Sequence, residues 1–237
     1  MALRLFLDSA DTETWAEIWP LGLFWGITTN PTLLRRSGRS CDMDGLGALA
    51  ALARDIGCGE LHLQAWGTTD GDLLACGRSL LALAPDLVVV KLPLTASGLR
   101  AARVLQQAGE RVTLTACYGI PQVIAAAALG VTYVAPYLGR ISDSGRDGAA
   151  DVLTMGRCLR GVDSSTRLLV ASLRSLAELT NLAAEGLDTF TLSPALARQL
   201  WTNAATAEAV RQFEADALGQ SPIPSCTPAP SPASAGA

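Results

Sequence analysis

The sequence predicts an α/β fold, a single (β/α)8 TIM barrel with parallel strands. Short apolar runs alternate with longer helical stretches, and eight such pairs can be counted along the chain. Strands that alternate with helices pair in parallel, and eight of these units close into a barrel. The chain has 237 residues, of which 49% are hydrophobic, and a barrel of this kind needs roughly 200–250 residues.

The strands are predicted from short runs that are rich in Leu, Val and Ile. The first run is 3–7 (LRLFL), and the fourth follows the turn residues Pro85-Asp86. The predicted strands cover residues 3–7, 25–28, 61–65, 87–92, 112–116, 131–135, 167–171 and 189–192.

The helices are predicted from apolar spacing and from start and stop signals. Asp11-Thr12-Glu13 suits a helix start, and Gly130 ends a helix. A polar, Gly-rich loop is expected within residues 35–45, and a second loop over residues 139–148. The first predicted helix begins near Asp11. A pair of helices is predicted over residues 32–56, and single helices over residues 70–84, 95–109, 120–129, 149–159, 176–185 and 195–218.

The predicted organisation is one barrel domain over residues 1–220 and a disordered tail over residues 221–237. The tail consists mainly of Pro, Ser and Ala, which bury too little apolar surface to become ordered. A doubly wound open sheet is the alternative fold. That fold favours a Gly-rich G-x-G-x-x-G turn after the first strand, whereas this chain has Asp8-Ser9-Ala10-Asp11 there.

Composition narrows the function classes. A net charge of -4 argues against a nucleic-acid or anionic-membrane partner, and no apolar run approaches the roughly 18 residues of a membrane span. The first residues are strand-like and lack a signal-peptide layout, so we expect a cytoplasmic protein. The six cysteines form no C-x-x-C pair and are expected to be reduced thiols. The only histidine, His62, is expected in the core or at the surface, and neither a metal nor a cofactor is expected.

The most informative residue is Lys91, the only lysine among 18 Lys and Arg residues. It ends an apolar, β-branched run, where a charged side chain is out of place. A desolvated lysine shifts toward the neutral amine, which attacks carbonyl groups. We therefore predict a Schiff-base lysine. The alternative is a lysine whose stem packs while its ammonium group reaches water.

Polar residues at the other strand ends are expected to surround Lys91, because barrel active sites form at the carboxyl ends of the strands. Each has an alternative structural role, such as helix capping for Asp8 or turn formation for Asn30. The alternative roles are local backbone hydrogen bonding for Thr115 and Ser172, core packing for Tyr137 and surface exposure for the arginines. The candidate set is Asp8, Thr28, Asn30, Gln64, Lys91, Thr115, Tyr137, Arg140, Ser172 and Arg174.

This set is suited to a carbonyl substrate that carries a phosphate. Lys91 condenses with the ketone, and the resulting cation accepts electrons when a carbon–carbon bond breaks. The base is Tyr137, or a water held by Asp8, Gln64 and Thr115. Arg140 and Arg174 suit phosphate, because the planar guanidinium group of an arginine near a barrel mouth matches its oxygens.

Six segments resemble the transaldolase family, in particular its short subgroup that includes fructose-6-phosphate aldolase. They occur in the family's order over nearly the whole chain before the tail, and GITTNP is the most specific. The segments are 6–10 (FLDSA), 26–33 (GITTNPTL), 89–93 (VVKLP), 115–119 (TACYG), 133–141 (YVAPYLGRI) and 170–174 (VASLR).

The resemblance implies a metal-free Schiff-base mechanism and a role for each matching residue. It identifies Lys91 as the Schiff-base lysine and Asp8 as the carboxylate that assists proton transfer. It further implies a sugar-phosphate substrate and a homo-oligomer, a pentamer or decamer. The remaining roles are dihydroxyacetone binding by Thr28 and Asn30, water binding by Gln64 and Thr115, and phosphate binding by Arg140, Ser172 and Arg174.

Within the family, Gln64 and Tyr137 resemble the aldolases, since transaldolases usually carry Glu and Phe at these positions. Arg140, Arg174 and 191–194 (TLSP) resemble transaldolases instead. We favour an aldolase that cleaves fructose 6-phosphate reversibly to dihydroxyacetone and glyceraldehyde 3-phosphate. The alternative is a transaldolase of the pentose phosphate pathway, with erythrose 4-phosphate as acceptor. A deoxyribose-phosphate aldolase and a catalytically silent sugar-phosphate sensor agree less well with these segments.

Overall fold

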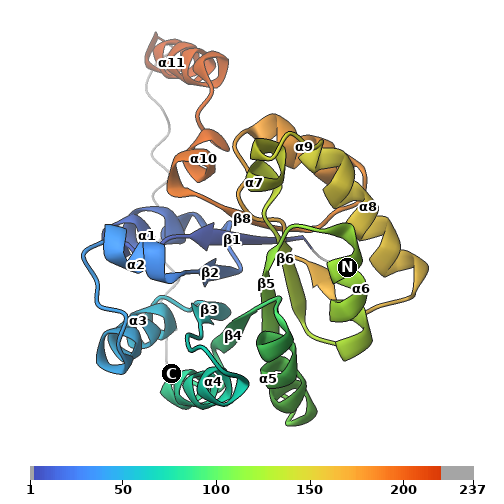
Figure 1. Ribbon diagram of the computed structural model, residues 1–237. Helices are drawn as coiled ribbons and strands as arrows, with labels where there is room; N and C mark the ends of the chain where they lie inside the picture. Colours follow the sequence, from blue (N-terminus) through green and yellow to red (C-terminus); the bar gives the residue numbers. More distant parts are fainter. Residues whose placement is uncertain (1–2, 220–237) are drawn as a thin grey trace, which may run out of the picture. The chain divides into compact units, whose positions relative to one another are not determined.

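The computed structural model describes residues 3–219 and contains the predicted eight-stranded parallel barrel (Figure 1). The described strands follow the order β7-β6-β5-β4-β3-β2-β1-β8, and neighbouring strands run in parallel. The ring closes where Val170 N donates to Thr189 O at 3.0 Å and Thr191 N donates to Val170 O at 2.9 Å. The strands are β1 (Arg4–Asp8), β2 (Gly26–Thr28), β3 (Glu60–Gln64), β4 (Val88–Pro93), β5 (Val112–Cys117), β6 (Tyr133–Pro136), β7 (Arg167–Leu168) and β8 (Thr189–Leu192).

Helices surround these strands, and polar side chains mark where many of them begin. Asp11 caps the first helix as its sequence suggests, and Thr69 and Ser175 each form a capping box. The helices of the barrel unit are α1 (Thr12–Ile18), the 3-10 turn η1 (Trp19–Leu21), α2 (Pro31–Arg36), α3 (Met43–Asp55), α4 (Asp70–Leu83), α5 (Ala96–Gln107), α6 (Ile120–Leu129), α7 (Leu138–Asp143), α8 (Gly148–Gly161), α9 (Leu176–Ala184) and α10 (Pro194–Gln199).

One expected loop is partly a helix. Residues 138–143, most of which lie within the predicted loop 139–148, form α7. Leu138 and Ile141 are buried one turn apart, and this short apolar repeat stabilises the helix despite the Gly, Asp and Arg residues around it.

The last predicted helix, 195–218, is interrupted. It is divided into α10 and α11 (Ala204–Gly219) by residues 200–203. The Asn203 side chain accepts hydrogen bonds from Ala205 N at 2.9 Å and Thr206 N at 3.2 Å, so Asn203 starts a new helix.

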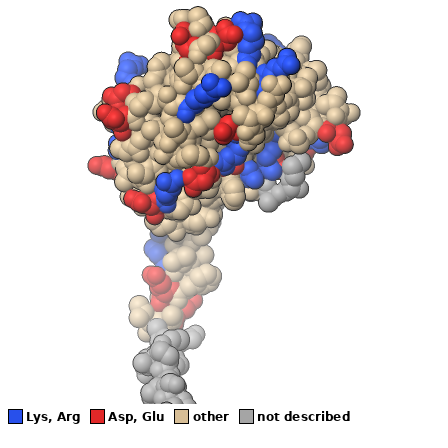
Figure 2. Space-filling model, turned by 90° about the horizontal axis from the view of Figure 1, so that it is seen from below, with Lys and Arg blue, Asp and Glu red and all other residues tan. Residues whose placement is uncertain are grey.

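The chain divides into two compact units, Met1–Leu200 and a second unit that begins at Trp201. The described part of the second unit contains α11, which has no buried residue. The predicted boundary at residue 220 and the predicted disordered tail, residues 221–237, lie outside the described residues. Between residues 3 and 219, no helix is both long and apolar enough to cross a bilayer. Acidic and basic side chains are interspersed over the face shown in Figure 2.

The core has two layers because successive strand residues point to opposite sides. One layer lies between the strands and the helices. The other fills the barrel and contains Phe6, Val89, Tyr133, Ala135 and Leu169.

Polar groups occupy the amino-terminal end of the barrel interior. His62 is fully buried, which places it in the core rather than at the surface. Its Nδ1 lies 3.0 Å from Thr113 Oγ1, and its Nε2 lies 3.2 Å from Glu60 Oε2. Glu60 also accepts a hydrogen bond from the Tyr133 hydroxyl at 2.7 Å and pairs with Arg4 at 3.3 Å.

Candidate active site

A cavity of about 380 Å³ opens at the carboxyl ends of the strands. Of the ten candidate residues, all except Thr115 and Arg174 line this cavity. Barrel closure therefore brings together residues that lie up to 164 positions apart in the chain, from Asp8 to Ser172. The candidates that line it are Asp8, Thr28, Asn30, Gln64, Lys91, Tyr137, Arg140 and Ser172.

Lys91 is held inside the barrel, with 5% of its surface exposed. Its Nζ donates a hydrogen bond to the Thr29 carbonyl at 2.8 Å, so its amino group does not reach out to water. Burial lowers the pKa of Lys91, and the nearby Asp8 charge partly opposes this effect. The amine is thus biased toward its neutral, nucleophilic form.

Asp8 shares the cavity with Lys91 and experiences the opposite shift. Burial raises the pKa of Asp8, while Lys91, a hydrogen bond from Thr28 and the charge of Arg140 lower it to a smaller extent. Thr28 Oγ1 donates to Asp8 Oδ1 at 2.6 Å and also lies 2.6 Å from Thr191 Oγ1. The helix-capping role considered for Asp8 belongs to Asp11 instead.

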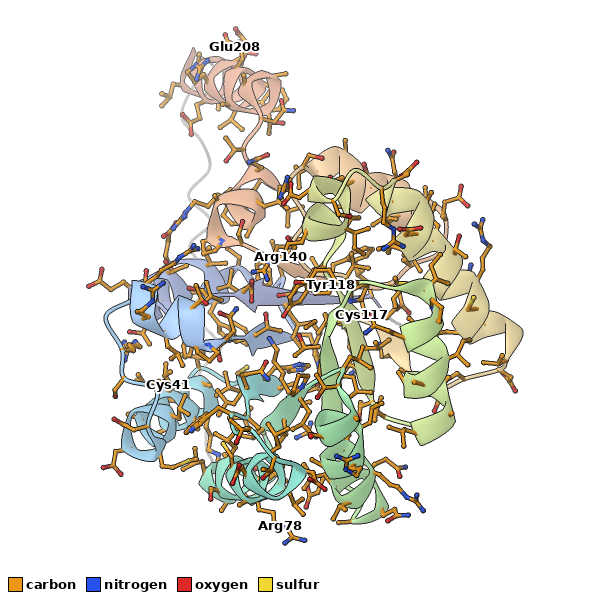
Figure 3. All side chains as sticks on the ribbon, viewed as in Figure 1. Cys41, Arg78, Cys117, Tyr118, Arg140 and Glu208 are labelled. Atoms are coloured by element: carbon orange, nitrogen blue, oxygen red, sulfur yellow. The ribbon has the colours of Figure 1, made fainter. Side chains whose placement is uncertain are left out.

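Tyr137 presents its phenol to the cavity, and its hydroxyl lies 2.7 Å from Thr115 Oγ1. Thr115 is buried and therefore contacts this phenol rather than lining the cavity itself. The Arg140 guanidinium lies 4.9 Å from the centre of the Tyr137 ring and donates to the Tyr118 hydroxyl at 3.3 Å. Figure 3 shows Arg140 and Tyr118 close together near the middle of the barrel.

Two amide side chains lie on the β2–β3 side of the cavity. Gln64 is the register partner of Lys91, and its Nε2 donates to the backbone carbonyls of Ala65 at 3.1 Å and Lys91 at 3.2 Å. Asn30 has the structural role considered for it, because its Oδ1 accepts from Leu33 N at 3.0 Å and caps α2. Since Asn30 also lines the cavity, the capping role and a binding role are compatible.

The chain after β7 approaches the cavity through a strained turn. Ser172 has a φ of 61°, in the left-handed region that non-glycine residues rarely occupy. Its carbonyl accepts a hydrogen bond from Gly139 N at 3.0 Å, which ties the turn to α7. Strain of this kind is common next to functional sites.

Arg174 does not line the cavity. Its guanidinium forms an ion pair with Asp143, and both side chains are about half exposed. Its assignment as a phosphate ligand therefore stays a prediction.

Three further polar residues, Thr32, Arg36 and Thr191, line the cavity but were missed from the sequence. Thr191 belongs to β8, where strand alternation assigns it, with Thr189, to the barrel interior. This alternation is visible in the sequence, so Thr191 could have been predicted. Arg36 ends α2, and nothing in its local sequence distinguishes it from its exposed neighbour Arg35.

The arrangement combines an amine of lowered pKa, a carboxyl group of raised pKa, a phenol and two guanidinium groups. The amine can attack a carbonyl group, the carboxyl and phenol can carry protons, and the guanidinium groups can bind an anion. Among residues 3–219, no group of three His, Cys, Asp or Glu side chains is placed to hold a metal ion.

The fold and the cavity place the chain in the class of (β/α)8-barrel enzymes. A family model described as transaldolase/fructose-6-phosphate aldolase matches residues 5–222. A protein from Paracoccus denitrificans (strain Pd 1222) named probable transaldolase is 34% identical, over 90% of this chain and 96% of its own length. Another of that name, from Caulobacter sp. (strain K31), is 35% identical over 92% of this chain and 97% of its own length. The chain belongs to the transaldolase/fructose-6-phosphate aldolase family.

Proposed function

We propose that the protein is a class I, metal-free aldolase that cleaves fructose 6-phosphate reversibly to dihydroxyacetone and glyceraldehyde 3-phosphate. The observation that carries this proposal is the buried Lys91 amine, which lies in a cavity together with Asp8 and Tyr137. Arg140, Ser172 and Arg174 bind the phosphate, and Thr28 and Asn30 bind the dihydroxyacetone hydroxyls.

The reaction proceeds through a covalent intermediate on Lys91. The neutral amine adds to the C2 carbonyl, and the adduct takes up a proton and loses water to give an iminium ion. A base removes the C4 hydroxyl proton, the C3–C4 bond breaks, and its electron pair moves into the iminium to form an enamine. Glyceraldehyde 3-phosphate leaves. Protonation of the enamine at C3 and hydrolysis then release dihydroxyacetone and restore the amine.

The proton carriers favour the aldolase over the transferase. Tyr137 is held by Thr115 and faces the cavity, so its phenol can exchange a proton with the intermediate. The amide of Gln64 cannot act as a base as a carboxylate would. Asp8, whose pKa is raised by burial, assists proton transfer near Lys91.

A transaldolase is the second candidate, and the names of the relatives favour it. Both relatives described above are named probable transaldolase. In that reaction the enamine attacks an aldose phosphate, such as erythrose 4-phosphate of the pentose phosphate pathway, instead of taking up a proton.

The deciding experiment measures glyceraldehyde 3-phosphate release from fructose 6-phosphate with and without erythrose 4-phosphate. Release without the acceptor, with equimolar free dihydroxyacetone, is the expected result. Release that requires the acceptor identifies a transaldolase and refutes the primary proposal.

Two variants test the proposed residues. Lys91→Arg keeps the charge but removes the nucleophile, so we expect loss of borohydride trapping and of cleavage in a protein that still folds. Tyr137→Phe is expected to slow dihydroxyacetone release by about 10²-fold, the typical contribution of a general acid–base group. Full release by Tyr137→Phe contradicts the role of the phenol.

The family resemblance also supports a cytoplasmic homo-oligomer, a pentamer or decamer, as part of this proposal. Light scattering after size-exclusion chromatography measures the assembly mass, and a monomer contradicts it.

A further inference from the structure

We propose that Arg36 is a further cationic ligand for the substrate phosphate, acting across the cavity from Arg140. This inference rests on the proposed function, because it concerns the same sugar-phosphate site. Neither the sequence segments that resemble the family nor the candidate set derived from them includes Arg36.

The barrel topology places the two arginines on opposite sides of the cavity. Arg36 ends α2, which follows β2, and Arg140 belongs to α7, which follows β6. In the ring of eight strands, β2 and β6 are four places apart. Both side chains line the same cavity, and the proposal places the substrate phosphate between them.

The face that α2 turns to the cavity explains why Arg36 takes part and Arg35 does not. Thr32 and Leu33, which lie four and three residues before Arg36, also line the cavity, as helical spacing requires. Arg35 lies on another face of the same turn and does not line the cavity. A basic residue in the last turn of a helix favours the helix dipole, but this effect applies to both arginines equally.

The ionisable groups that line the cavity carry more positive than negative charge. The charged or ionisable lining groups, apart from the Tyr137 phenol, are Asp8, Lys91, Arg36 and Arg140. Asp8 and Lys91 offset each other, whether both are charged or both neutral. Arg174 has its own counterion in Asp143. The Arg36 side chain has no hydrogen-bond or ion-pair partner among residues 3–219. The remaining charge of two matches a phosphate monoester, which carries about −1.5 to −2 at pH 7.

The test compares Arg36→Ala with Arg35→Ala, a matched control one residue away. We expect Arg36→Ala to lower kcat/KM for fructose 6-phosphate by about 10- to 100-fold, mainly through KM, as for the loss of a charge-assisted contact. Cleavage of unphosphorylated fructose should change less than about twofold, and Arg36→Lys should restore part of the activity. Arg35→Ala should match the wild type on both substrates.

Titration with inorganic phosphate separates this inference from the proposed function. If the wild type fails to cleave fructose 6-phosphate, the proposed function is wrong, yet calorimetric phosphate binding still reports on Arg36. We expect the wild type to bind phosphate and Arg36→Ala to bind it at least about tenfold more weakly.

Three results would overturn the inference. The first is equal phosphate affinity in Arg36→Ala and Arg35→Ala, or no saturable binding by the wild type. The second is an equal loss of activity on fructose and fructose 6-phosphate, which indicates a structural role. The third is a loss seen only with fructose 1,6-bisphosphate, which assigns Arg36 to a different phosphate at C1.

Discussion

At the residue scale, burial acts in opposite directions on the two ionisable groups next to the proposed reaction centre. It lowers the pKa of Lys91 and raises that of Asp8, so both are biased toward their neutral forms. A neutral amine can attack a carbonyl, and a protonated carboxyl can return a proton. Burial thus shifts the pKa of each group in the direction that the proposed reaction needs.

The pH dependence of Lys91 is a prediction at this scale. The Asp8 charge raises the pKa of Lys91, so Asp8→Asn is expected to lower that pKa further. The pH profile for borohydride trapping of Lys91 with dihydroxyacetone should therefore shift to lower pH. The overall cleavage rate should fall by about 10²-fold, because the proton carrier is lost. Asp55→Asn, at an exposed position, serves as the control. A shift of the profile to higher pH contradicts this reading.

At the element scale, the contact between α7 and the end of β7 decides where Arg140 and Ser172 lie. Gly139 N donates to Ser172 O at 3.0 Å, and Leu138 N donates to Ala171 O at 2.9 Å. A Cβ at Gly139 would lie 2.5 Å from the Ser172 carbonyl oxygen, a backbone atom that cannot move alone. The helix and the strand end can approach this closely only because residue 139 is glycine.

Gly139→Ala is therefore expected to separate α7 from the strained turn. We expect a loss of about 1–3 kcal/mol of unfolding free energy in urea, the usual cost of overpacking. The KM for fructose 6-phosphate should also rise, since Arg140 and Ser172 both shift. Gly161→Ala adds its methyl group in open space at the end of α8 and should change neither quantity. If Gly139→Ala has the stability and the KM of the wild type, the contact between residue 139 and the Ser172 carbonyl is not rigid.

At the scale of the whole molecule, the two ends of the barrel interior contain different kinds of structure. The carboxyl end holds the cavity, whereas the amino end holds a buried polar network around Glu60 and His62. Burial alone would raise the pKa of Glu60, but hydrogen bonds from His62 and Tyr133 and the charge of Arg4 hold it below its usual range. Burial lowers the pKa of His62, against the effect of Glu60.

This network predicts acid-sensitive stability. A histidine with a lowered pKa takes up a proton more readily when unfolded, so its contribution fades as the pH falls below about 6.5. A carboxylate with a lowered pKa stabilises the fold above about pH 4.3, and that contribution is lost at lower pH. The free energy of unfolding in urea should fall in both windows.

Glu60→Gln tests the contribution of the Glu60 carboxylate to this network, because it replaces the charge with a neutral amide. It should cost about 3–5 kcal/mol at pH 7, because Arg4 and Arg111 lose their buried counterion. It should also flatten the pH dependence below about pH 5. A wild-type free energy of unfolding that is equal at pH 7 and pH 4 would falsify the linkage. An exposed control such as Glu185→Gln should retain the wild-type profile.

Much of this molecule follows from local patterns in its sequence. Eight apolar runs, each followed by a helical stretch, predict the barrel because strand and helix periodicity are local properties. The same reasoning selects most of the polar residues that line the cavity, since parallel strands bring their carboxyl ends to one edge. The isolation of Lys91 among seventeen arginines predicts the most important candidate before any contact is known.

Tertiary structure decided what depends on residues that are far apart in the sequence. Arg36 lines the cavity, and Arg174 pairs with Asp143, 31 residues away, instead of lining it. Likewise, His62 finds Thr113 51 residues away inside the barrel. The physical reason is that side chains far apart in the sequence come into contact only when the barrel closes. Neither hydrophobic periodicity nor capping signals carry information about which groups then meet.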